Sequence, residues 1–466
     1  MTKDERSFDA RFVIRHSSFV ILFSLLLACG FSARAAGTNV LVWHQAADRV
    51  DADIHGLALW PLLEDVARQT GWHIFVETGA TRNASVKFKS LPSNDALKML
   101  LGKLNFALVP GTNGPARLYV FTTRMENATQ PVRAPRGPPK HVPNELLVKV
   151  KPGTDIDALA KMLGAKIIAR DDKLGIYRLQ FADADATDTA LGKLKNNPDV
   201  LAADYNYYFD PPSVPQLAAG ASVAPLSLTL NPTTDSSDPC HVTVGLIDTP
   251  LQSLGSQLDQ FVVKSIPEAG DAKPDPASPT HATGMLYNLL YSASQAGHGS
   301  SSLRVVHVDV YGQNPMTTSW DVALGVQAAV NNGANVLNMS LGSGGDSTVL
   351  DAVIKQAIAN GVIVFAAAGN ESVDTATYPA AIPGVNAVTA TQNGQIAPYA
   401  DYGNFVSMAL PGANVVYYNG QPYVFQGTSV STALATGVAA GTKGANCWSW
   451  TQIQSAMQQQ FAVPQK

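Results

Sequence analysis

The chain is organised around one stretch, Gly427-Thr428-Ser429-Val430-Ser431-Thr432-Ala433, which small residues continue as far as Ala440. Glycine permits a tight backbone turn, and Thr and Ser are common in the first turn of a helix. The small residues that follow predict a helix thin enough to pass through a packed core. Ser429 would then lie at the positive end of a helix dipole, where a developing negative charge is stabilised. An ordinary capped and buried helix would show the same pattern.

Three segments upstream favour chemistry at this serine. Asp248 follows the apolar run 242–247, His281 opens an apolar helical segment, and Asn370 follows the apolar run 361–369. Acyl transfer needs these four groups: a nucleophile, a base, a residue that orients the base, and a donor to the oxyanion. The chain order Asp, His, Ser is one of three known for this set of residues.

With these motifs, residues 240–466 resemble the catalytic domain of subtilisin-like (subtilase) serine proteases. The resemblance implies that Ser429 is the nucleophile and that His281 is first general base and then general acid. Asp248 would hold the imidazole tautomer, and Asn370 would bind the oxyanion together with the Ser429 N–H.

The resemblance also implies where a substrate binds. Ser340, Leu341 and Gly342 match the edge segment that pairs with the substrate backbone. Ala368 and Gly369, after Ala367, match the opposite wall of the pocket for the residue before the cut. Small side chains there leave room for a large apolar group.

The pattern of 240–466 independently predicts an α/β fold with a doubly wound parallel sheet, because buried apolar strands alternate with amphipathic helices. The predicted strands are 242–247, 305–310, 334–339, 361–367 and 385–390, and the predicted helices are 281–296, 320–331, 348–360, 430–440 and 450–459. Ligands of such sheets bind outside the carboxyl ends of the strands. Asp248, Ser340 and Asn370 all follow those ends.

Three positions depart from the family pattern: Pro250 and Ala282 stand where glycine is usual, and Ala433 stands where proline is usual. None of them removes a reacting group. The segment after Asp248 lacks the acidic residue that often binds calcium, so no metal or cofactor is predicted and structural calcium has no support. His298, between two glycines, is interpreted as a loop residue rather than a base.

Composition and cysteines indicate an exported protein. Of 466 residues, 15% are charged and the net charge is −4, so no basic surface indicates a nucleic-acid partner. Residues 1–36 are typical of a secretory signal peptide, with an apolar core too short to span a membrane and a small-x-small site before Ala36. Cys29 also resembles the acylation site of a lipoprotein. Beyond the signal, Cys240 and Cys447 form an even pair, which favours a disulfide over two free buried thiols.

Two small α+β domains are predicted ahead of the catalytic domain. Residues 46–123 resemble the short N-terminal domain of secretins and TonB-dependent receptors, and a generic α+β domain is the alternative. Proline-rich residues 124–143 are predicted to be a linker. Residues 144–209 resemble the inhibitory propeptide domain of subtilases, or else a permanent accessory domain of that fold. Residues 210–239 read as an exposed linker that is easily cut.

These parts together predict an exported serine endopeptidase, secreted or periplasmic and made as a self-processing precursor. Its partners would be protein or peptide substrates, its own propeptide as inhibitor, and an outer-membrane envelope partner bound through 46–123. The alternative is a catalytically weak or silent subtilase-fold protein that binds in the envelope through its N-terminal domain. A third reading makes this docking the main function and proteolysis secondary.

Overall fold

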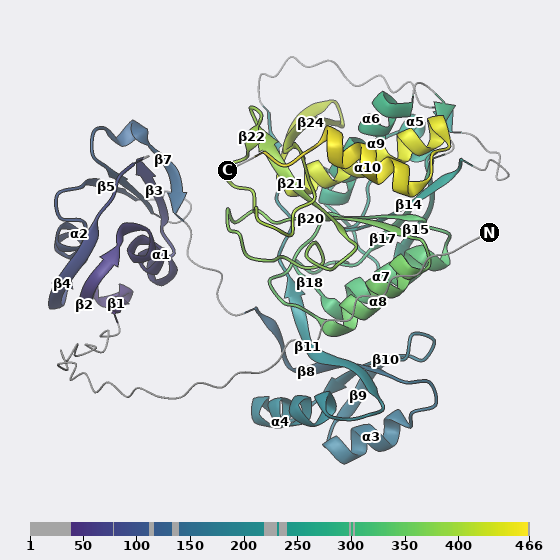
Figure 1. The fold of residues 1–466 in the computed structure, drawn as a ribbon, viewed down its shortest axis with the longest axis horizontal. Helices are drawn as coiled ribbons and strands as arrows, with labels where there is room; N and C mark the ends of the chain where they lie inside the picture. The colour runs from purple at the N-terminus through teal and green to yellow at the C-terminus, as the bar shows by residue number, and fades with distance from the viewer. Residues whose placement is uncertain are drawn as a thin grey trace, which may run out of the picture.

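The computed structural model describes residues 39–77, 79–110, 116–132, 139–218, 231–232, 240–297, 300–301 and 303–464. The predictions for the signal peptide 1–36, for Cys29 and for His298 lie outside these ranges. Within them, no helix combines the length and the apolar character needed to span a membrane. Figure 1 shows two small α+β units and one large α/β unit.

The large unit is built on an eight-stranded sheet, counted over the described residues, with the order β15-β17-β14-β19-β20-β21-β22 and with β23 paired to β21. Its strands are β14 (Val242–Asp248), β15 (Val262–Pro267), β17 (Leu303–Asp309), β19 (Val336–Met339), β20 (Ile363–Ala367), β21 (Asn386–Gln392), β22 (Gln395–Ile396) and β23 (Met408–Pro411). Every pair is parallel except β21 with β22. The predicted doubly wound α/β fold is confirmed.

Helices cover both faces of this sheet, which explains why its strands are apolar on both sides. One face packs against α6 (His281–Gly297), α9 (Thr428–Asn446) and α10 (Trp450–Gln460). The other packs against α7 (Ser319–Asn331) and α8 (Thr348–Ala359). Neighbouring residues of one strand alternate between the two cores: Val305 faces the first and Val306 the second.

The helices α6 and α9 lie side by side in close contact (Figure 1). A Cβ on Gly437 would lie 2.1 Å from the Leu289 carbonyl oxygen, and one on Gly441 would lie 2.5 Å from that of Ala293. Only glycine permits this approach, so the small residues of α9 have a packing role. Both contacts keep the same register with the two helices running in the same direction. Continued back by two turns, that register brings His281 level with Ser429.

Residues 141–209 form the second small unit, with β8 (His141–Val150), α3 (Ile156–Leu163), β9 (Lys166–Asp171), β10 (Ile176–Gln180), α4 (Ala184–Lys195) and β11 (Val200–Phe209). Its sheet has the order β18-β11-β8-β10-β9, in which the short β18 (Thr317–Thr318) belongs to the large unit. Leu146 and Val148 of β8 pack on the unit's own helices, whereas Leu147 packs in the core of the large unit that α7 and α8 share. The two units are therefore joined by a continued sheet and by a common apolar core.

The first small unit extends beyond the predicted 46–123 at both ends. It comprises β1 (Val40–His44), η1 (Gln45–Ala47), β2 (Arg49–Ala58), α1 (Leu59–Thr70), β3 (His73–Glu77), β4 (Asn83–Pro92), α2 (Ser93–Leu101), β5 (Asn105–Val109), β6 (Arg117–Phe121), η2 (Met125–Asn127) and β7 (Ala128–Val132). β1 pairs with β2, and β7 pairs with β3. Because β7 and the start of β8 occupy parts of 124–143, the linker predicted there is shorter than expected.

The segment predicted as the linker 210–239 also makes pairs. Gln216–Leu217 forms β12, which joins the hairpin of β24 (Ala413–Tyr418) and β25 (Gln421–Gln426). Asn231–Pro232 forms β13, parallel to β16 (Ser300–Ser301). Its described parts are thus extended but not free of contacts.

A disulfide joins Cys240 to Cys447, with 4.8 Å between the two Cα atoms. Cys240 lies just before β14 and Cys447 caps the end of α9, so the bond ties the first strand of the large unit to its core helix. The predicted pairing is confirmed.

Replacing both cysteines by serine is expected to lower the free energy of unfolding by about 2–4 kcal/mol, because the bond closes a loop over a sequence separation of 207 residues. Urea unfolding of the double variant, compared with the unchanged chain, measures this. An unchanged midpoint with both cysteines replaced would contradict it.

Candidate active site

Asp248 and His281 form a buried pair at the carboxyl end of β14 and the first residue of α6. The Asp248 Oδ1 lies 2.8 Å from the His281 Nδ1, and each side chain is 2% exposed. The same oxygen accepts the Thr249 N–H at 2.7 Å. An ionised carboxylate can only accept, so Nδ1 carries the proton and Nε2 is left as the acceptor. Among the described residues this buried Nε2 has no hydrogen-bond partner.

Ser429 lies in the first turn of α9, after Gly427 with a φ of 144°. Its Oγ donates to the Ser340 carbonyl at 3.1 Å, and the Ser340 Oγ donates to the Ser429 carbonyl at 3.0 Å. The serine hydroxyl therefore bonds to the end of β19 and not to His281, although the α6–α9 register brings the two residues to one level.

Asn370 follows β20 and is oriented by the start of α9. Its Oδ1 accepts the Thr428 N–H at 2.8 Å, which fixes which end of the amide is the oxygen. Gly427 allows this contact. A Cβ at this position would lie 3.2 Å from the Asn370 Nδ2, and the φ of 144° is one that residues with a side chain rarely adopt. The amide donor of Asn370 thus lies beside the helix start that carries Ser429.

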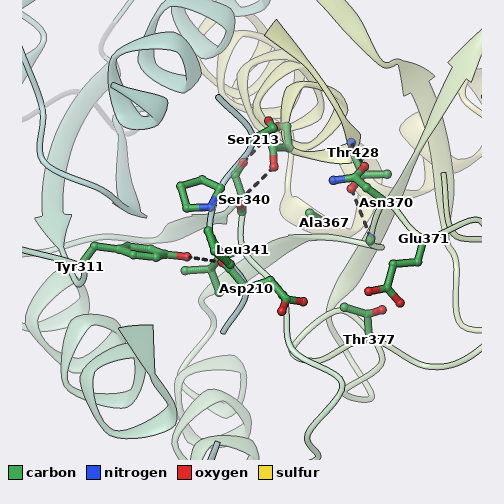
Figure 2. Close-up of a pocket in the computed structure, with 15 residues that line it drawn as sticks. Asp210, Ser213, Tyr311, Ser340, Leu341, Ala367, Asn370, Glu371, Thr377 and Thr428 are labelled. Atoms are coloured by element: carbon green, nitrogen blue, oxygen red, sulfur yellow. Dashed lines mark hydrogen bonds between the residues drawn. The ribbon is translucent and has the colours of Figure 1, made fainter. Parts of the chain in front are cut away.

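A cavity of about 280 Å³ lies at Ser429 (Figure 2). It is lined by Asp210, Pro211, Pro212, Ser213, Tyr311, Ser340, Leu341, Gly342, Ala367, Gly369, Asn370, Glu371, Thr377, Thr428 and Ser429. Of the residues expected to bind substrate, only Ala368 does not line it. Ala368 is fully buried, and its N–H donates to the Val388 carbonyl. Its two neighbours along the chain, Ala367 and Gly369, line the cavity instead.

Glu371 and Thr377 are cavity residues that the sequence analysis missed. Figure 2 shows the Glu371 carboxylate lying towards Thr377 at one end of the cavity. The expected apolar pocket therefore carries polar groups. Glu371 directly follows Asn370 in the sequence, so its place beside this predicted site residue was the available signal. Among the described residues, no group of three or more His, Cys, Asp or Glu side chains could hold a metal ion.

The chain's own residues 208–213 run through this site. The Asp210 N–H donates to the Gly342 carbonyl at 3.2 Å, and the Ser343 Oγ donates to the Tyr208 carbonyl at 2.8 Å. The segment therefore runs antiparallel to 340–343. This register places Pro212 opposite Ser340, whose carbonyl accepts the Ser429 hydroxyl.

Phe209 of this segment is buried in the apolar core and does not line the cavity at Ser429. Phe209 is 1% exposed and packs in the same apolar cluster as Leu341 and Tyr311. The Tyr311 hydroxyl donates to the Asp210 carbonyl at 3.3 Å, which holds the chain beyond Phe209 (Figure 2).

His307 supports the turn after Asp248 and was also missed. Its Nε2 lies 2.8 Å from the Thr249 carbonyl, which can only accept, so Nε2 donates and Nδ1 accepts from the Ser265 hydroxyl at 2.8 Å. The Thr249 Oγ1 in turn accepts the Ala282 N–H at 2.9 Å. His307 is 1% exposed, and this burial lowers its pKa. A single histidine within an apolar strand gave no signal of this role.

Replacing His307 by leucine is expected to lower kcat/KM by about tenfold, because it leaves the Thr249 carbonyl without its donor beside Asp248. His307→Gln, whose amide can still donate, should retain activity within about threefold. Because the pKa of His307 is lowered in the folded chain, only the unfolded chain takes up a proton here between about pH 6.5 and the folded pKa. The free energy of unfolding therefore decreases as the pH is lowered through that window. Equal activity of the Leu and Gln variants would contradict this role.

Two family models match parts of the chain. Residues 240–463 match the model of the subtilase family, and residues 127–206 match that of the fervidolysin N-terminal prodomain. Residues 240–463 are therefore similar to subtilase domains, and residues 127–206 are similar to a prodomain of this type.

Curated relatives match over parts of their length. The thermostable alkaline protease of Halalkalibacterium halodurans is 37% identical over 35% of this chain and 46% of its own length. Subtilisin BL of Lederbergia lenta is 35% identical over 38% of this chain and 65% of its own length. This chain thus spans about half to two thirds of these two relatives. Among solved structures, fervidolysin of Fervidobacterium pennivorans, a keratinolytic enzyme related to subtilisin, shares 19% identity with a TM-score of 0.48, over 64% of this chain and 54% of its own.

Proposed function

We propose that this chain, with its subtilase domain and prodomain, is a serine endopeptidase that hydrolyses peptide bonds through an acyl-enzyme. One observation carries the proposal: the buried Asp248–His281 pair leaves Nε2 of His281 without a partner, at the level of Ser429. A histidine whose Nδ1 is bonded to a carboxylate, with Nε2 left as the acceptor, is the base that a serine nucleophile requires.

In the proposed reaction, the Ser429 hydroxyl exchanges its bond to the Ser340 carbonyl for one to His281. Its oxygen attacks the scissile carbonyl while Nε2 takes the proton, and Asp248 stabilises the imidazolium. The oxyanion is bound by the Asn370 amide and by the Ser429 N–H at the start of α9. His281 then returns the proton to the leaving amine. A water molecule releases the acyl group by the same steps in reverse.

Covalent labelling tests this proposal and the silent-fold alternative directly. A fluorophosphonate should modify Ser429 in the processed protein, since it needs an activated serine beside an oxyanion site. Ser429→Ala protein is the control for labelling elsewhere. A folded, processed protein that takes up no label would support the silent binding protein instead.

The prodomain is proposed to act as the inhibitor of the precursor. Its sheet joins β18, and residues 210–213, which follow it, line the cavity at Ser429. Added separately, the pieces lose the effective concentration that the covalent link provides, so inhibition should weaken on dilution.

A 139–213 fragment added to the mature enzyme is expected to inhibit it competitively at micromolar concentration. A fragment that ends at Tyr207 should bind at least about tenfold more weakly, because it lacks the buried Phe209 side chain, worth about 1.5–3 kcal/mol. Titration with an internally quenched peptide substrate measures both constants. Equal inhibition by the two fragments would contradict a role for the tail.

Export is proposed from the signal-like 1–36 and from the disulfide, which persists in oxidising compartments. Fractionation of cells that make the full chain distinguishes three outcomes: release into the medium, release into the periplasm, and lipid anchoring at Cys29.

The unit that starts at β1 is proposed to be the secretin/TonB-like domain and to bind an envelope partner. Its deletion should leave peptide hydrolysis unchanged and should release the protein from the envelope fraction.

A further inference from the structure

In the described structure, one edge of the strand β25 is covered only by residues 216–218, which belong to the segment that follows the prodomain (the tail, residues 210–218). β24 pairs with β25 along its whole length on the other edge, from Ala413 with Gln426 to Tyr418 with Gln421. On this edge, Gln216 lies opposite Val424 and Leu217 opposite Tyr423. The Ala218 N–H also donates to the Pro422 carbonyl at 2.9 Å.

This edge continues directly from the reacting centre. β25 ends at Gln426, one residue before the glycine that begins the Ser429 turn. The tail crosses from the Gly342 side of the cavity to the β25 side: Asp210 bonds to Gly342, and the Ser213 Oγ donates to the Gln426 carbonyl at 3.2 Å. With Pro212 opposite Ser340, the residues after Pro212 lie on the side of the leaving group.

We propose that this edge of β25 is a substrate-binding site for an extended polypeptide, which pairs through the fourth to sixth residues after the cut bond. The inference rests on the proposed peptidase function. Those places are taken here by Gln216, Leu217 and Ala218. After a cut next to Pro212, residues 213–218 stay attached to the mature chain. When they come off β25, the strand presents an unpaired edge, and an extended chain can add to it as a strand.

Recognition at this edge is by backbone rather than by side chain. Gln216 and Leu217 are both exposed, Leu217 by 56%, so their side chains contribute little contact. The substrate class is therefore an unfolded or extended protein segment of varied sequence, and short peptides lack part of the binding site.

The bonding pattern makes the site testable position by position. In an antiparallel pair, hydrogen-bonded residues alternate with residues that are not bonded. Because the Ala218 N–H bonds to β25, the Gln216 N–H does so too, and the Leu217 N–H points away.

The experiment uses the mature enzyme and internally quenched peptides that are identical up to the cut and for three residues after it. A peptide with six residues after the cut should have a kcat/KM on the order of tenfold above that of the peptide with three. Replacing the N–H of the fourth or the sixth residue by an ester oxygen should each lower it several-fold. The same replacement at the fifth residue is the matched control and should change little.

Equal kcat/KM for the long and the short peptide would overturn the proposal, as would equal losses at the fourth, fifth and sixth residues. Equal rates would also result if the enzyme's own segment stayed on β25, and they would count against the site in the same way. Failure to cleave either peptide would instead overturn the proposed peptidase function.

Discussion

Ser429→Ala protein is expected to lose peptidase activity by a factor on the order of 10⁶, the size known for loss of the nucleophile in a subtilisin. It should also accumulate as an uncut precursor that ends at residue 466. The physical reason is that the Ser429 hydroxyl, at the start of α9, is the group proposed to pass its proton to the unpartnered His281 nitrogen. Mass spectrometry of the purified protein and hydrolysis of a quenched peptide measure the two effects.

Ser431→Ala is the matched control, because Ser431 lies in the same helix but donates to the Leu410 carbonyl at 3.0 Å. It should mature and keep its activity within about tenfold, since it loses one buried hydrogen bond. If purified Ser429→Ala protein still converted itself to a shorter form, self-processing through Ser429 would be wrong.

Asn370→Asp is expected to lower kcat by about 100- to 1,000-fold or more, with a smaller change in KM. Removal of one such donor costs about 100- to 1,000-fold in a subtilisin. The aspartate keeps the shape and the acceptor for the Thr428 N–H, but it puts a negative oxygen where the amide donor stood. A developing oxyanion would then face a like charge.

Asn370→Ala separates the lost donor from the added charge and should retain more activity than Asn370→Asp. Thermal unfolding of both variants controls for a loose start of α9. If both kept kcat within about threefold of the unchanged enzyme, Asn370 would have no part in stabilising the oxyanion.

The central sheet could be predicted because its strands are buried on both faces. Runs such as 242–247 and 361–369 are apolar without alternation, and each is followed by a polar residue, Asp248 and Asn370. The same rule indicated that Asp248, Ser340 and Asn370 share one edge. The structure brings Asp248 to His281 and Ser340 to Ser429, and it positions Asn370 by Thr428.

Short and edge strands could not be predicted, because tertiary contacts and not local pattern decide them. β12 and β18 have only two residues each, and each exists through a pairing with a distant part of the chain: β12 pairs with β25, and β18 pairs with Tyr208 and Phe209 of β11. His307 was missed for a related reason. Its role depends on its bond to the Thr249 carbonyl, which is set by the packed fold.

The two prolines at the cavity would make residues 210–213 a poor substrate for the proposed peptidase. Pro212 has no N–H to offer Ser340, and the Ser340 carbonyl is occupied instead by the hydroxyl that must attack. The same tail is held in place through Phe209 and Asp210, so tight docking and slow cutting are combined in a few residues. We expect the result to be a delay: the protease domain can fold, close its disulfide and reach its destination before it begins to digest the proteins around it.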